Sequence, residues 1–261
     1  MTALAVWLLL VGGLDLARAR HRFGRRPVLL VAAVGAVCSL VAAVLVGPEG
    51  PGWVAWVAAT VGIAGWVVGS SVAAAGFGRV PTPRVPASVT PVRAAALAYA
   101  SLLAGVLALL LAGPAAGRAP GLLAALDRSG LAHLPPERVL LVLAAVVVQI
   151  STANVIVRLL LDLVGVPASD NEKTLRGGRV LGPMERLLIL GLGVGGSLTG
   201  AAVVVAAKSL LRFPELRVPR AGDPGYGGAS DITEYFLVGS FASWLVALGS
   251  VGLVALALPG S

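Results

Sequence analysis

Residues 27–46 read PVLLVAAVGAVCSLVAAVLV, twenty consecutive residues without a charge. A helix of this length spans about 30 Å at 1.5 Å per residue, which matches the hydrocarbon core of a bilayer. The stretch ends at GPEGPG, residues 47–52, whose glycines and prolines are typical of a turn. The sequence therefore predicts a transmembrane helix followed by a turn.

The composition of the whole chain agrees with this local pattern. Hydrophobic residues make up 57% and charged residues 12%, whereas a soluble domain has about 25% charged residues. Apolar segments recur along the chain and predict seven spans, or six spans and a re-entrant hairpin at residues 183–213; segment 137–165 is predicted to be one long helix. We expect a single, all-α membrane domain over residues 1–261, a polytopic transmembrane helix bundle with seven apolar segments at about 3–17, 27–46, 53–76, 92–112, 137–165, 183–213 and 231–257.

The positions of the basic residues predict the orientation of the bundle. Basic residues follow the first apolar segment, and cytoplasmic loops carry an excess of Lys and Arg. This predicts a retained anchor in a cytoplasmic membrane, with the N-terminus and the turn 47–52 outside and the loop 166–182 inside. The five arginines after the first segment are Arg18, Arg20, Arg22, Arg25 and Arg26.

The net charge of +8 and the pI near 11 raise the question of partners. Nucleic-acid binding is excluded because no basic soluble domain with interleaved aromatic residues is present to carry it. Basic loops beside a membrane attract anionic lipid headgroups, so the predicted partner is the bilayer itself. A protein partner or a homo-oligomer stays open.

Two apolar segments contain features that predict more than a plain span. Gly65 and Gly69 in segment 53–76 have the spacing that lets membrane helices approach closely. Segment 137–165 holds the most polar patch of any span. Such residues either form hydrogen bonds to neighbouring helices or line a solute path. The patch consists of Gln149, Ser151, Thr152 and Asn154.

Segment 183–213 has two interpretations. In a straight helix, Glu185 lies in the first turn after Pro183, and Lys208 and Arg212 lie in the last turn, as the helix dipole favours. The glycine-rich residues 191–200 are also a plausible place to turn, because Gly destabilises a helix interior. The straight helix is slightly favoured. A re-entrant hairpin instead puts the charged candidates at similar depth: Glu185, Arg186, Lys208, Arg212 and Glu234.

Three short motifs occur in order in the C-terminal half: Glu185-Arg-Leu-Leu188, Ala207-Lys-Ser209 with Arg212-Phe213, and Glu234-Tyr235 with Gly239. Over about residues 154–248 the chain resembles an uncharacterised family of bacterial integral membrane proteins, a domain of unknown function. The resemblance implies a bacterial inner membrane and brings no activity. Where that family has a His and an Asp in its first apolar segment, this chain has Asp15.

The remaining motifs favour a function other than catalysis. His21 and His133 lie in different loops and Cys38 is the single cysteine, so we expect no metal site and no cofactor. The polar patch and the glycine-rich segment favour a transporter or channel for a small solute. One alternative is a membrane scaffold that binds anionic lipid or a cytoplasmic protein. Another is an enzyme acting on a lipid headgroup, with Glu185 or Glu234 as the base.

Overall fold

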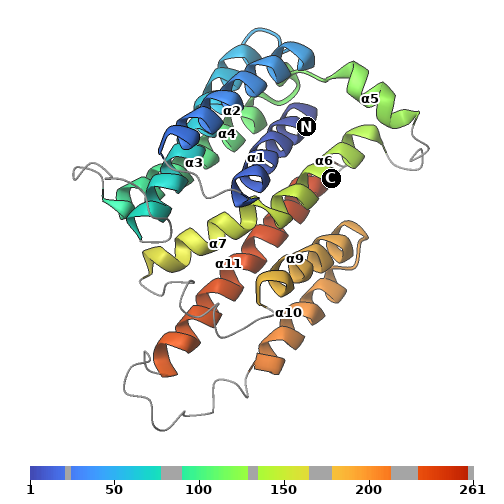
Figure 1. The fold of residues 1–261 in the computed structure, drawn as a ribbon. Coiled ribbons are helices and arrows are strands. Elements are labelled where there is room, and N and C mark those ends of the chain that lie inside the picture. Colours follow the sequence, from blue (N-terminus) through green and yellow to red (C-terminus); the bar gives the residue numbers. More distant parts are fainter. Residues whose placement is uncertain (21–24, 78–89, 129–134, 165–177, 213–228, 258–261) are drawn as a thin grey trace. The chain divides into compact units, whose positions relative to one another are not determined.

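The computed structural model describes residues 1–20, 25–77, 90–128, 135–164, 178–212 and 229–257, and for 20, 25–26, 178–180, 208–212 and 229–236 it describes the backbone alone. Five of the described helices are long and apolar enough to cross a membrane, or six if α6 and α7 count as one bent span. The prediction of a helical membrane protein is confirmed, but seven spans are not. The helices are α1 (Thr2–Arg20), α2 (Arg25–Val46), α3 (Gly52–Gly76), α4 (Pro91–Ala112), α5 (Pro120–Asp127), α6 (Pro136–Ile150), α7 (Thr152–Leu163), α9 (Gly178–Val194), α10 (Leu198–Arg212) and α11 (Ala229–Ala255), with a 3-10 helix η1 (Gly113–Ala116) (Figure 1).

The chain divides into two compact units. The first comprises Met1–Val155 together with Leu256–Ser261, and the second comprises Ile156–Ala255. Helices α1 to α6 therefore belong to the first unit, and α9, α10, α11 and most of α7 belong to the second. Each unit has its own packing.

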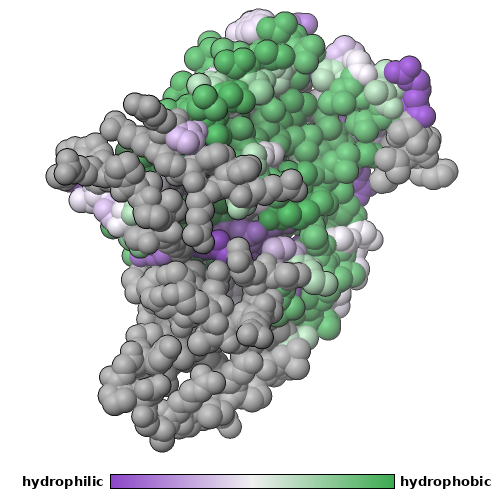
Figure 2. All heavy atoms as spheres, viewed as in Figure 1, coloured by the Kyte–Doolittle hydropathy of each residue, from purple (hydrophilic) through white to green (hydrophobic). Residues whose placement is uncertain are grey.

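In the first unit, α2 turns its large side chains outward and its small ones inward. Leu30, Val44 and Leu45 are more than 60% exposed, whereas Ala32 and Ser39 are buried. A soluble helix would bury the large residues, but lipid tails are as apolar as Leu, so membrane helices meet through small residues. Hydrophobic residues accordingly cover most of the described surface that is visible in Figure 2.

Glycines bring α3 and α4 into close contact. A Cβ atom on Gly62 would lie 2.8 Å from the carbonyl oxygen of Ser101, and one on Gly69 would lie 3.0 Å from the Cβ of Ala98. A Cβ on Gly65 would also overlap Ser101. The close approach predicted from Gly65 and Gly69 is confirmed, since the two backbones meet where side chains are smallest.

Helix α1 runs parallel to α3, because contacts with α3 advance in the same direction along both helices. The indole Nε1 of Trp7 donates to the carbonyl oxygen of Ala59 at 2.9 Å, and Asp15 accepts from Trp66 further along. On another side of α1, a Cβ on Gly12 would lie 2.7 Å from Val147 of α6. Helix α1 therefore lies between α3 and α6.

Segment 137–165 is not the single helix that the sequence predicted. Helices α6 and α7 are separated at Ser151 and bent by 40°. Ser151 ends α6 with φ −115° and ψ −77°, which does not continue the α-helical path. The polar patch of the sequence therefore surrounds a break in the helix.

Segment 183–213 is also broken, so the straight alternative is wrong. Helices α9 and α10 are joined by residues 195–197, where Gly196 has φ +85° and the N–H of Ser197 donates to Leu192. Glycine adopts positive φ without the steric penalty of a Cβ. Helix α10 folds back along α9 (Figure 1). Ile189 of α9, Ala201 of α10 and Ala247 of α11 form one buried cluster.

We expect Gly69→Val to destabilise the first unit, because its side chain would press on Ala94 and Ala98 of α4. Overpacking of this kind costs about 1–3 kcal/mol. Gly13→Val is the matched control, since a Cβ on Gly13 would have no atom within 4 Å among the described residues. Thermal unfolding of the purified protein in detergent measures both changes, and equal effects would contradict the close packing.

The hairpin predicts that residues near its two open ends face the same side of the membrane. Single cysteines replace Leu181 and Ala207 in a Cys38→Ala background, and Glu49→Cys marks the turn at residues 47–51. An impermeant maleimide should label both Leu181→Cys and Ala207→Cys in intact cells, or both in inverted vesicles. Labelling of these two positions from opposite sides would contradict the hairpin and restore the straight span.

Candidate functional site

Among the described residues of the first unit, an ion pair within α1 has several hydrogen-bond partners on α3. Asp15 is 2% exposed, and its Oδ1 accepts from the guanidinium Nη2 of Arg18, one helical turn later. Residues three apart lie on one helix face and can pair. Because a single buried charge without a partner is costly, each of these two side chains makes the burial of the other possible.

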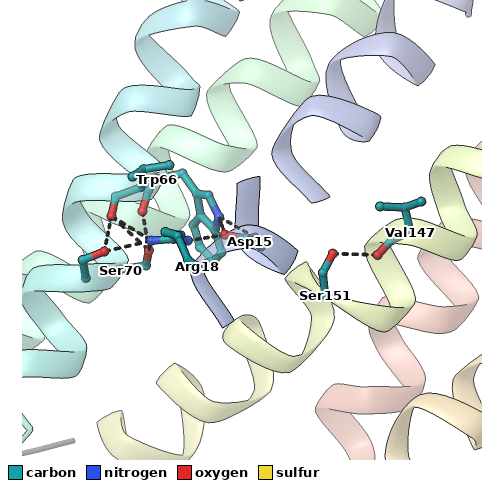
Figure 3. A network of polar contacts seen from close by, with 8 residues as sticks. Asp15, Arg18, Trp66, Ser70, Val147 and Ser151 are labelled. Atoms are coloured by element: carbon teal, nitrogen blue, oxygen red, sulfur yellow. Dashed lines mark hydrogen bonds and ion pairs between the residues drawn. The ribbon is translucent and has the colours of Figure 1, made fainter. Parts of the chain in front are cut away.

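Helix α3 supplies the other partners of this ion pair. The indole Nε1 of Trp66 donates to both carboxylate oxygens of Asp15, at 2.9 and 3.2 Å. The guanidinium Nη1 of Arg18 donates to the hydroxyls of Ser70 and Ser71, at 3.0 and 2.8 Å, and to the carbonyl oxygen of Val67 at 3.0 Å. Figure 3 shows this network, which we call the α1–α3 polar network.

The two serines of the network are held in place by their own helix. Ser70 donates to the carbonyl oxygen of Trp66 at 2.5 Å, and Ser71 donates to that of Val67 at 2.7 Å. Each hydroxyl proton is therefore engaged within α3, and the hydroxyl oxygen faces Arg18 as an acceptor. This arrangement suits a cation, because both oxygens present lone pairs toward the guanidinium.

The α6–α7 break is a second polar region of the first unit. The hydroxyl of Ser151 donates to the carbonyl oxygen of Val147 at 2.6 Å, and the side-chain amide of Asn154 donates to that of Ile150 at 2.7 Å. Figure 3 shows Ser151 turned toward Val147 on the preceding turn. The amide of Asn154 satisfies the carbonyl of Ile150, whereas the carbonyl of Val147 also accepts from the N–H of Ser151 at 3.1 Å.

The structure buries most of the polar patch that was predicted from the sequence. Gln149, Ser151 and Thr152 are buried and Asn154 is half-buried. The hydrogen bonds of Ser151 and Asn154 given above run to Val147 and Ile150 of α6, so that of Asn154 crosses the break. Whether the patch lines a solute path stays a prediction.

The charged candidates of the second unit lie on three helices. Arg186 of α9 is 3% exposed and donates to the hydroxyl of Ser243 of α11 at 3.2 Å, while Glu185 is half-buried. Lys208 and Arg212 lie on α10 and Glu234 lies on α11, but their side chains are outside the described residues.

The hairpin changes the relation between Glu185 and the basic end of α10. Glu185 precedes the end of α9 by nine residues and Lys208 follows the start of α10 by ten, so both backbones are about 14–15 Å from the turn.

Helix α9 begins at Gly178, and Pro183 lies inside it. Glu185 is therefore not in the first turn, and the helix dipole does not explain it as the sequence suggested.

Sequence reasoning gave Asp15 no partners, although a signal was present. An acid and an arginine three residues apart in an apolar segment indicate a local ion pair. Trp66, Ser70 and Ser71 lie about fifty residues away, and no local pattern connects them to Asp15. Among the described residues, no group of three or more His, Cys, Asp or Glu is placed to hold a metal ion.

The α1–α3 polar network predicts strong coupling between its two charges. Asp15→Asn leaves Arg18 as a buried cation, and Arg18→Gln leaves Asp15 as a buried anion. We expect each single change to lower the free energy of unfolding by about 3–5 kcal/mol, and the double change to cost clearly less than their sum.

Thermal or denaturant unfolding in detergent measures this double-mutant cycle. Asp127→Asn is the matched control, because Asp127 is exposed on α5 and we expect its change to be nearly neutral. Additive effects of the two changes would mean that Asp15 and Arg18 contribute independently.

Comparison with known proteins found no match, so the site is interpreted from its geometry. No protein-family model matches the chain, and no curated protein or solved structure matches it either. Membership of the uncharacterised bacterial family thus stays a proposal that rests on the three motifs between Glu185 and Gly239.

Proposed function

We propose that this protein transports a small solute across a bacterial cytoplasmic membrane. The observation that carries the proposal is the interruption of two apolar segments, at Ser151 and at residues 195–197. Non-helical backbone at membrane depth is tolerated where it is buried in protein or lines a water-filled cavity. In transporters, discontinuous helices form the substrate and ion sites.

The charges of the second unit support the same proposal. Ionisable residues within membrane segments mark functional sites by default, and Arg186 is buried between α9 and α11. An α9–α10 hairpin that enters and leaves from the cytoplasmic side leaves more of the Lys and Arg residues on that side than a straight span does. This supports an orientation with the N-terminus outside and with the basic loops against anionic headgroups.

The turn of the hairpin offers the sharpest variant for a transport test. Gly196→Ala places a Cβ on a residue with φ +85°, which is strained for any L side chain. Gly191→Ala is the matched control, since its Cβ would have no atom within 4 Å in the part of the chain that the structure describes. Each change adds one methyl group, and the two positions lie five residues apart in the sequence.

Stopped-flow light scattering of proteoliposomes measures solute entry as re-swelling after an osmotic challenge. The probes are urea, glycerol, potassium acetate and potassium phosphate. We expect the wild type and Gly191→Ala to re-swell faster than protein-free liposomes for at least one probe, and Gly196→Ala to be slower by more than about tenfold for that probe, a change that corresponds to 1.4 kcal/mol in the barrier. Identical rates for all four probes with and without protein would contradict transport of this class of solute.

A further inference from the structure

Helix α5 is apolar on nearly every side, yet none of its residues is buried. Residues 120–127 read PGLLAALD, in which Asp127 is the single charged residue. Leu122 is 39% exposed, and Leu123 and Leu126 are half-buried. A helix that is hydrophobic all round is normally buried, and a helix shorter than about 12 residues is marginally stable in water on its own. Helix α5 therefore needs an apolar cover that the described residues do not supply.

The start of α5 is fixed to the ends of two membrane-spanning helices. The carbonyl oxygen of Ala115 accepts from the N–H of Glu49 at 2.9 Å, and the N–H of Arg118 donates to the carbonyl oxygen of Val46 at 3.0 Å. The apolar span of α2 ends at Val46, and that of α3 begins at Gly52. Because α5 begins two residues after Arg118, it starts at the level where these spans meet the membrane surface.

The direction of α5 agrees with a position along that surface. Figure 1 shows α5 running across the direction of α3 and α4, both of which belong to the same compact unit. A helix that crosses the direction of membrane-spanning helices at their ends lies close to the plane of the membrane, as interfacial helices do. Leu122 and Ala125 are three residues apart, so they share one face of α5, and both are exposed.

Lipid fits the exposed face of α5 better than a second copy of the chain. A stable protein interface takes about 20–30 residues from each partner, whereas α5 has eight residues. Arg118 and Arg128 are exposed at its two ends, and arginines at a membrane boundary extend their charged heads toward the headgroups. The Nε of Arg128 also donates to the carbonyl oxygen of Ala124 at 3.1 Å. An apolar middle between polar ends matches the boundary between acyl chains and headgroups.

We propose that α5 binds the phospholipid surface of the bilayer, with Leu122 and Ala125 at the acyl boundary and Arg118 and Arg128 at the phosphate groups. The surface is on the side of the membrane where α4 ends and α6 begins. The inference goes beyond the proposed transport, because α5 can bind lipid whether or not a solute crosses the membrane. Its test therefore measures lipid contact and involves no flux.

The experiment attaches an NBD fluorophore to single cysteines of the full-length protein in a Cys38→Ala background, in proteoliposomes of phosphatidylcholine and phosphatidylglycerol. A nitroxide on the acyl chain near the headgroup quenches probes in lipid, and iodide quenches probes in water. We expect the probe on Ala125→Cys to be quenched by the nitroxide lipid and protected from iodide. Val37→Cys, on the 59% exposed position of α2, is the lipid reference, and Glu49→Cys in the exposed turn is the water reference.

A substitution at Leu122 tests whether its apolar side chain holds α5 on the lipid. An ionised carboxylate is costly in an apolar environment, so Leu122→Asp should make the probe on Ala125→Cys lose its nitroxide quenching and gain quenching by iodide. Leu122→Met is the matched control, because it keeps the apolar character and nearly the same volume. We expect Leu122→Met to leave both kinds of quenching unchanged.

Three results would overturn the proposal. Iodide quenching at Ala125→Cys as strong as at Glu49→Cys would mean that α5 stands in water. Protection of Ala125→Cys from both quenchers would mean that protein, such as a second copy of the chain, covers α5. These two results use the unchanged Leu122, so they stand even if Leu122→Asp does not fold. An unaltered quenching pattern in a folded Leu122→Asp protein would mean that Leu122 does not contact the acyl chains.

Discussion

The ion pair between Asp15 and Arg18 constrains the packing of the first unit, because neither charge can be left alone in an apolar bundle. The cost of burying each ion is several kcal/mol unless hydrogen bonds and the opposite charge offset it. Trp66, Ser70 and Ser71 supply those bonds, and all three lie on α3. A shift of α1 by one turn, about 5.4 Å, would separate the pair from every one of these partners. The register of α1 against α3 is thereby set by charge satisfaction.

The same need for partners shapes the two broken helices, where backbone groups rather than charges must be satisfied. At Ser151 the amide of Asn154 bonds the carbonyl of Ile150, and both the N–H and the hydroxyl of Ser151 bond that of Val147. Between α9 and α10 the backbone does this itself, since Ser197 donates to Leu192 across a turn that Gly196 makes possible. These local hydrogen bonds offset part of what each interruption costs in an apolar solvent.

Packing between the helices depends on small residues, and the sequence predicted one such contact correctly. Gly65 and Gly69 have a spacing that is visible without a structure, and α4 does approach α3 there. The glycines at 191–200 were ambiguous, because close packing of a straight helix and a turn both call for glycine. The hairpin is favoured by contacts that the local pattern does not contain, namely the packing of Ile189 against Ala201 and Ala247.

The sequence by itself determined that the chain forms apolar helices of membrane-spanning length and where most of them begin and end. These properties depend on hydropathy and on turn residues, which act within one segment. The tertiary structure alone decided the breaks at Ser151 and at residues 195–197, the partners of Asp15 and the burial of Arg186 against Ser243. The physical reason is that an apolar bundle tolerates a charge or a helix break only where groups from distant segments pack against it. Those contacts exist only in the folded chain.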